Sequence, residues 1–140
     1  MKGRTYRYFT DALFPFGYGL SYTQFEMKGA GVEKKGNNPT DWTVTAVVAN
    51  TGKYDGTEVV QVYIRNLQDP DGPLKSLRAF KRVDVKAGQT ATAVMELDSR
   101  SFEFWDAETN TMRVKPGKYE ILVGTSSDDK NFKNLAVTFK

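Results

Sequence analysis

Five acidic side chains have the most obvious capacity for chemistry in this sequence: Glu103, Asp106 and Glu108 around one aromatic segment, and the adjacent Asp128 and Asp129. Two facing carboxylates can act in hydrolysis, one as the acid and the other as the base or nucleophile. Glu103 and Asp106, however, flank an expected strand, where solvated charges on the outer face are typical. Asp128 and Asp129 lie in the run SSDDKN, which is typical of a turn. We therefore predict no catalytic residue in this chain.

The composition excludes several other kinds of site. The chain contains no cysteine and no histidine, which rules out zinc sites of the usual kind, Ser-His-Asp triads and Cys-His dyads. Calcium is the one plausible metal, because only oxygen ligands are plentiful. Asp69, Asp71, Asp128 and Asp129 could supply them, but no 12-residue calcium-binding loop is present. We expect surface turns, and neither a metal nor a cofactor.

Trp42 and Trp105 could form platforms for stacking sugars, although a tryptophan in a sandwich strand more often fills a core or an interface. A basic group occurs at Lys75, Arg78, Lys81, Arg82 and Lys86. Asp84 interrupts it, and the net charge is only +3 from 20 basic and 17 acidic residues, so we expect no nucleic-acid partner. No apolar run approaches the roughly 20 residues that span a bilayer, and we expect no membrane partner. The first residues, MKGRTY, lack the apolar segment of a signal peptide.

The spacing of apolar residues predicts an all-β, antiparallel sandwich. The chain of 140 residues has the length of one domain. Short runs rich in Val, Ile, Thr, Tyr and Phe alternate with Gly, Pro, Asn and Asp clusters. The expected strands are Phe25–Ala30, Trp42–Asn50, Glu58–Asn66, Leu77–Val85, Ala91–Leu97, Phe102–Trp105, Tyr119–Thr125 and Leu135–Phe139.

Alternation within the strands predicts which side chains enter the core. The core residues expected from it are Val60, Val62, Ile64, Ala93, Met95, Leu97, Tyr119, Ile121 and Val123. Gln61 and Tyr63 are expected to point outward. Tyr119 follows Pro116-Gly117 and opens its strand, a placement that suits a tyrosine corner, in which the hydroxyl bonds back to nearby backbone.

The first 25 residues differ from the rest of the chain. They hold eight aromatic side chains, interrupted by Pro15, Gly17 and Gly19. Such a segment is too apolar for a free tail and too irregular for an ordinary strand. Composition leaves two alternatives equally open: this arm wraps its own sandwich, or it covers an interface with a neighbouring domain. We divide the chain into an arm, residues 1–22, and a sandwich domain, residues 23–140.

Several motifs carry a resemblance to a known family. LFPFGYGLSYTQF at 13–25, preceded by GRTYRY at 3–8, resembles the signature of family 3 glycoside hydrolases. VVQVY at 59–63, LRAFKRV at 77–83 and FWD at 104–106 are similar to later motifs of that family, with Ala79 in place of the usual glycine. PGKY at 116–119 and VGTSSD at 123–128 resemble its closing motif. The matches cover nearly the whole chain, in order.

The resemblance implies the C-terminal fibronectin type III-like, immunoglobulin-like domain of a β-glucosidase or β-xylosidase. In that family a TIM-like barrel supplies an aspartate nucleophile, and an α/β sandwich domain commonly supplies a glutamate acid/base. Neither is represented here, so no catalytic residue can be assigned to any position of this chain. The implied partners are those two domains of the same parent hydrolase, an enzyme of carbohydrate metabolism. We expect the parent to be periplasmic or secreted, and Met1 to lie inside a longer reading frame.

The implied role is that of an accessory domain that packs against the catalytic domains and stabilises them. The residues expected to make this interdomain contact are Tyr6, Tyr8, Phe14, Phe16, Tyr18 and Tyr22. With the resemblance included, we favour the interdomain role for Phe14, Phe16 and Tyr18, whereas Tyr22 and Phe25 are also expected to enter the sandwich's own core. The alternative is a carbohydrate-binding module that targets the enzyme to polysaccharide, or at least makes weak carbohydrate contact.

Overall fold

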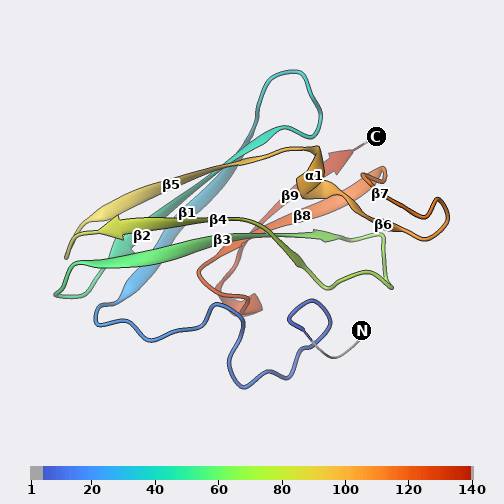
Figure 1. Cartoon of the computed structure of the whole chain (residues 1–140). Helices are drawn as coiled ribbons and strands as arrows, with labels where there is room; N and C mark the ends of the chain where they lie inside the picture. Colours follow the sequence, from blue (N-terminus) through green and yellow to red (C-terminus); the bar gives the residue numbers. More distant parts are fainter. Residues whose placement is uncertain (1–4, 140) are drawn as a thin grey trace.

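Two antiparallel sheets pack face to face in the computed structural model of the chain, which describes residues 5–139 (Figure 1). One sheet has the order β1-β2-β5 and the other the order β4-β3-β8-β9. The strands of the first sheet are β1 (Phe25–Lys34), β2 (Trp42–Asn50) and β5 (Thr90–Leu97). Those of the second are β4 (Ser76–Val85), β3 (Gly56–Asn66), β8 (Gly117–Gly124) and β9 (Lys133–Phe139). The predicted all-β sandwich is therefore confirmed.

The alternating apolar residues of both sheets meet in one core. Val60, Val62 and Ile64 of β3 are fully buried against side chains from the other sheet, such as Val44 and Val48. Met95 and Leu97 of β5, and Tyr119, Ile121 and Val123 of β8, join the same cluster. The core faces predicted from strand alternation are thus confirmed. Successive side chains of a strand point to opposite faces, so when one face is buried the apolar residues occur at every second position.

A tyrosine corner fixes the entry to β8. The Tyr119 hydroxyl donates to the Lys115 carbonyl at 2.9 Å and accepts from the Lys115 amide at 3.2 Å. The ring itself lies in the core beside Phe102 and Phe139. The predicted corner is confirmed, and it satisfies two backbone groups just before the strand begins.

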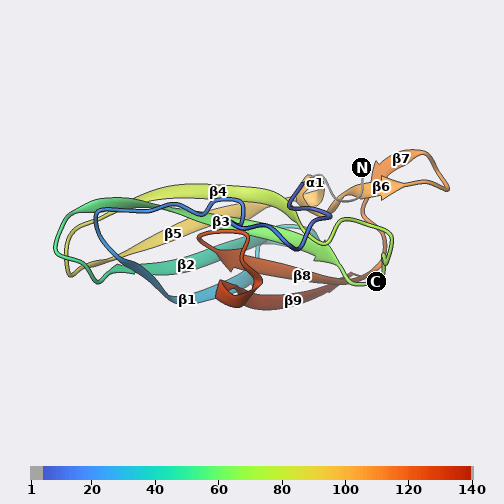
Figure 2. The ribbon, with the colours of Figure 1, turned by 90° about the horizontal axis from the view of Figure 1, so that it is seen from below.

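The expected strand at Phe102–Trp105 is wrong in its first half. Ser99–Phe102 forms a short helix, α1, whose N-cap Asp98 exchanges hydrogen bonds with Ser101. Strand β6 (Phe104–Asp106) follows and pairs with β7 (Thr111–Arg113), which the sequence pattern did not predict. In Figure 2 this β6–β7 hairpin projects beyond one end of the sandwich.

The expectation that Gln61 and Tyr63 face solvent is wrong. Tyr63 is completely buried and Gln61 is 5% exposed. Both lie on the outer face of β3, but a segment far away in sequence covers that face. The arm, drawn in blue in Figure 2, passes in front of β3 and β4, and its contacts with both side chains define the candidate site.

Candidate functional site

Tyr6 attaches the start of the arm to the outer face of the larger sheet. Its ring lies 5.7 Å from that of Tyr63 in an edge-to-face arrangement and stacks on Phe16 at 5.0 Å. Its hydroxyl accepts a hydrogen bond from the amide of Leu77 in β4 at 3.0 Å. The buried Tyr63 hydroxyl in turn donates to Gln61 Oε1, so a continuous set of rings and polar groups joins the arm to β3.

Backbone hydrogen bonds hold the arm at two further places. The Arg7 carbonyl accepts from the amide of Leu74, and the Phe16 carbonyl accepts from the amide of Ser127, each at 2.7 Å. The Leu74 amide lies in the loop before β4, and the Ser127 amide lies in the loop after β8. Both of these strands pair with the central strand β3. The arm therefore follows a defined path across the sheet.

Gly17 permits the closest approach of the arm to β3. Its φ is +80°, a left-handed conformation that favours glycine. A Cβ atom at this position would lie 2.3 Å from Nε2 of Gln61, the same amide that donates to the Thr125 carbonyl at 2.9 Å. Any side chain at 17 therefore has to displace Gln61 or lift the arm.

A buried polar clamp ends the arm at Thr23. The Thr23 hydroxyl donates to Asn50 Oδ1 at 2.6 Å, and Asn50 Nδ2 donates to the carbonyls of Tyr54 and Val85. Thr23 is 8% exposed and Asn50 is 1% exposed. The clamp lies at the expected junction between arm and sandwich, although the division at 22/23 remains a prediction.

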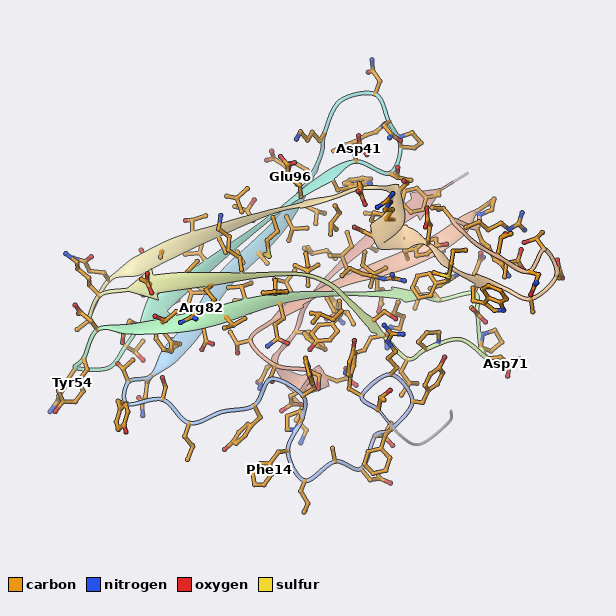
Figure 3. All side chains as sticks on the ribbon, in the orientation of Figure 1. Phe14, Asp41, Tyr54, Asp71, Arg82 and Glu96 are labelled. Carbon is orange, nitrogen blue, oxygen red and sulfur yellow. The ribbon has the colours of Figure 1, made fainter. Side chains whose placement is uncertain are left out.

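Between residues 13 and 22 the arm carries large apolar side chains that are at least half exposed to solvent. These side chains, with the exposed fraction of each, are Leu13 (94%), Phe14 (68%), Phe16 (50%), Tyr18 (52%), Leu20 (93%) and Tyr22 (99%). We call these six residues the apolar row. Within it, Phe14 and Tyr18 stack on each other at 5.2 Å. Phe14 is labelled beside the lower part of the arm in Figure 3.

The six side chains expected at an interdomain contact thus divide into two groups. Phe14, Phe16, Tyr18 and Tyr22 belong to the apolar row, whereas Tyr6 and Tyr8 are half-buried. The expectation that Tyr22 enters the core is wrong, because its side chain is almost wholly exposed. Phe25, by contrast, packs against the core.

Sequence reasoning missed further exposed side chains on or near the arm, among them Leu13, Leu20 and Phe80. Leu13 and Leu20 complete the apolar row; their signal was the alternation of large apolar residues with glycine in the run LFPFGYGL. Phe80 of β4 is 67% exposed and pairs across the sheet with Gln61, the residue beneath Gly17. Nothing in the alternation of β4 distinguished Phe80 from an ordinary outward side chain.

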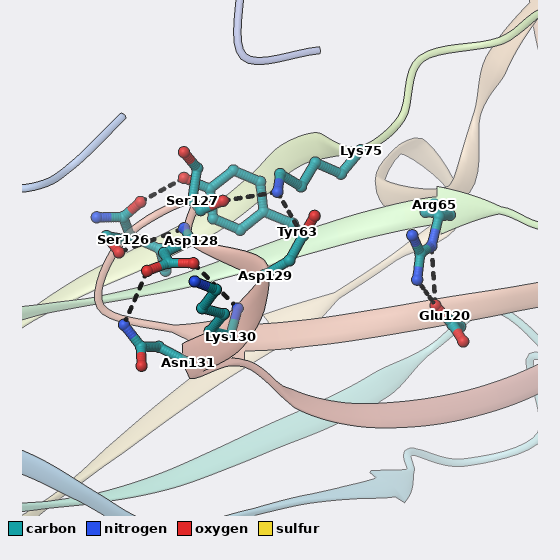
Figure 4. A network of polar contacts seen from close by, with 11 residues as sticks. Tyr63, Arg65, Lys75, Glu120, Ser126, Ser127, Asp128, Asp129, Lys130 and Asn131 are labelled. Carbon is teal, nitrogen blue, oxygen red and sulfur yellow. Dashed lines mark hydrogen bonds and ion pairs between the residues drawn. The ribbon is translucent and has the colours of Figure 1, made fainter. Parts of the chain in front are cut away.

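A hollow of about 900 Å³ lies between the arm and the loop after β8. Phe9, Leu13 and Phe14 line one part of it, and Lys75 and Asp129 line another. Lys75 is 7% exposed. Figure 4 shows its ammonium donating to the Ser127 carbonyl and to Asp129, each at 2.6 Å. This buried cation holds the loop in place, because a charge without partners would be costly there.

Asp128 and Asp129, two of the acidic side chains considered for catalysis, have structural partners instead. Asp128 caps the short 3-10 helix Asp129–Asn131 through the amide of Lys130, and Asp129 pairs with Lys75. No group of three or more potential metal-ligating residues occurs within residues 5–139. No helix in the same range is long and apolar enough to cross a membrane.

The expectation that Asp106 is a solvated charge on the outer face of a strand is wrong. Its side chain is fully buried and pairs with Arg113 Nε at 2.6 Å and Lys115 Nζ at 2.9 Å. Thr109 Oγ1 and the Glu108 amide also donate to it. The hydrogen bond from Lys115, with those from Thr109 and Glu108, lowers the pKa of the Asp106 carboxyl to about 2. Asp106 therefore fastens the β6–β7 hairpin to the segment that leads into β8.

A second groove, of about 540 Å³, separates this hairpin from the start of the arm. Trp105, Arg78 and Tyr8 are among its lining residues. Trp105 is 55% exposed. Trp42, by contrast, packs against the core and donates its indole N–H to the Pro39 carbonyl at 3.0 Å.

The comparisons with known proteins agree with this architecture. Residues 58–127 match the family model of the fibronectin type III-like domain. A xylan 1,4-beta-xylosidase of Xylanibacter ruminicola is 66% identical over 138 residues, which cover 99% of this chain and 16% of that protein. An exo-alpha-(1->6)-L-arabinopyranosidase of Bifidobacterium longum is 44% identical over 117 residues, covering 83% of this chain and 15% of that protein.

Solved structures give the same result. The GH3 beta-glucosidase of Bifidobacterium adolescentis matches with a TM-score of 0.78 at 37% identity, over 89% of this chain and 18% of that chain. A beta-glucosidase of Listeria innocua in complex with glucose matches with a TM-score of 0.78 at 33% identity, over 90% and 17% of the two chains. The chain therefore spans about a sixth of the length of its first relatives.

A sandwich of three and four antiparallel strands with a family match across its centre defines a fibronectin type III-like domain. The chain belongs to that family. More particularly, it is the fibronectin type III-like domain found in family 3 glycoside hydrolases, as the sequence motifs indicated. Those larger proteins are hydrolases, and this domain is not their catalytic one.

Proposed function

We propose that this domain is an accessory domain that docks on the catalytic domains of the same parent chain, a family 3 β-glucosidase or β-xylosidase, and stabilises them. The apolar row carries the proposal. The arm is held on the sheet by ring contacts and backbone hydrogen bonds, yet the six large apolar side chains of the apolar row are at least half exposed to water. An ordered apolar surface of this kind is typical of an interface.

The free energy that docking would contribute follows from the exposed fractions of the side chains in the apolar row. Full burial of a large apolar side chain contributes roughly 1.5–3 kcal/mol. Phe14 and Tyr18 are each more than half exposed, so a partner that covers both gains about 2–3 kcal/mol from these rings alone. In the isolated domain only the smaller, already buried part of these rings is lost on replacement by a polar residue, at an expected cost of about 1–2 kcal/mol.

A chimera tests the proposal. Residues 5–140 replace the corresponding segment of the Xylanibacter ruminicola xylosidase, to which the chain is 66% identical. The double variant Phe14→Ser/Tyr18→Ser is expected to destabilise the chimera by about 2–3 kcal/mol more than it destabilises the isolated 140-residue chain, and so to lower its melting temperature further. Calorimetry of both proteins measures the two effects.

Tyr54→Ser is the matched control. Tyr54 is 65% exposed but lies in the turn between β2 and β3, outside the arm, so its replacement should leave both melting temperatures unchanged. A chimera that tolerates the double variant as well as it tolerates Tyr54→Ser would show that the apolar row is not an interdomain contact.

A further inference from the structure

We propose that the groove between the arm and the β6–β7 hairpin is a binding site for a neutral oligosaccharide, with Trp105 as the stacking platform. The site lies apart from the apolar row and does not depend on docking of the catalytic domains. Its volume of about 540 Å³ falls within the ~300–1,000 Å³ range typical of small-molecule sites.

Trp105 is presented outward by the geometry of the hairpin. In β6 the flanking residues Phe104 and Asp106 are buried, so the alternation of the strand turns Trp105 to the surface. Its cross-strand partner Met112 is 50% exposed and also lines the groove. Because Asp106 anchors the hairpin through two ion pairs, the indole stands on a supported element rather than on a free loop.

Arg78 supplies fixed hydrogen-bond donors in the groove. Its guanidinium carbon lies 4.8 Å from the centre of the Phe104 ring, and Nη2 donates to the Glu103 carbonyl. Its Nε is buried without a hydrogen-bond partner within the described part of the chain. Burial and the nearby Arg7 charge lower the pKa of the Arg78 guanidinium. A rigid cationic donor beside another cation favours acceptor oxygens of a ligand.

The charges of the lining select a neutral ligand. The groove is lined by the basic residues Arg7, Arg78 and Lys115 and by the acidic residues Asp69, Asp71, Asp106 and Glu108. Lys115 and Asp106 form an ion pair with each other, so charges of both signs nearly balance in the lining. A phosphate or uronate would meet these carboxylates at close range, which disfavours anionic ligands. Sugar hydroxyls, by contrast, donate to carboxylates and accept from guanidinium groups, while the C–H face of a pyranose ring packs on an indole. An aromatic platform beside donors and acceptors of both signs therefore suits a neutral saccharide.

Nuclear magnetic resonance provides a direct test, because the chain contains only two tryptophans. The 140-residue protein is titrated with xylohexaose, with cellohexaose and, as the acidic probe, with hexagalacturonate. We expect at least one neutral hexasaccharide to shift the indole N–H signal of Trp105 and to leave that of Trp42 unchanged. Hexagalacturonate is expected to bind at least tenfold more weakly.

Three variants complete the test. Trp105→Ala should weaken binding at least tenfold, Trp105→Phe should retain part of the affinity, and the distant Tyr54→Ala should bind like the wild type. An unperturbed Trp42 signal verifies that each variant is folded. The proposal is overturned by a Trp105 signal that neither neutral probe moves, by binding that Trp105→Ala leaves intact, or by preferential binding of hexagalacturonate.

Discussion

Gly17→Ala is expected to release the arm from the sheet. Alanine at a φ of +80° costs about 1–2 kcal/mol because of the left-handed backbone. Its Cβ would lie 2.3 Å from Gln61 Nε2, so Gln61 has to move and give up its hydrogen bond to the Thr125 carbonyl, a loss of about 1 kcal/mol. Together these terms favour local opening of the arm by about 2–3 kcal/mol.

Amide hydrogen exchange at Ser127 reports this opening, because that amide donates to the carbonyl of Phe16, next to the substituted residue. A change of 2–3 kcal/mol corresponds to exchange about 30- to 150-fold faster. Gly19→Ala is the matched control, since no atom lies within 4 Å of the Cβ position at Gly19. Equal Ser127 exchange in the two variants would refute the reasoning that Gly17 holds the arm against β3.

Two further substitutions test the structural anchors. Tyr119→Phe removes both hydrogen bonds to Lys115 and is expected to lower the unfolding free energy by about 1–3 kcal/mol in urea titrations with an unchanged m-value; an effect no larger than that of Tyr54→Phe would contradict the tyrosine corner. Asp106, whose pKa is lowered to about 2, stabilises the fold above its unfolded-state pKa near 4, and this contribution is lost as the pH falls towards 2. The stability difference between wild type and Asp106→Asn should therefore shrink between pH 4 and pH 2, and a constant difference across that window would contradict the ion-paired carboxylate.

The strands were predictable because each is a local pattern. The expected range Trp42–Asn50 coincides with β2, and the starts of β4 and β5 differ by one residue from the expected ones. Alternation of apolar and polar residues identifies the buried face of a strand when the other face is exposed to water. The same rule failed at Gln61 and Tyr63, because the arm covers the outer face of β3 from more than 40 residues away in sequence.

The candidate site was predictable in composition but not in detail. An aromatic arm pointed to an interface, yet only the fold shows that Tyr6 attaches it while Phe14 faces water. Asp106 was misjudged for a related reason, since Arg113 and Lys115 become its partners only when the β6–β7 hairpin closes. Contacts that form only when distant segments meet or a hairpin closes cannot be predicted from the alternation of residues within one strand.

The clamp at Thr23 and Asn50 has a consequence for any domain joined ahead of the arm. Because the arm is fixed to the sandwich at Tyr6, Phe16 and Thr23, its residues add almost no free length to the connection. A short effective tether keeps the local concentration of the apolar row high near the attached domain. A modest intrinsic affinity is then enough to keep the two domains closed, and lengthening the tether would weaken their association without altering a single contact.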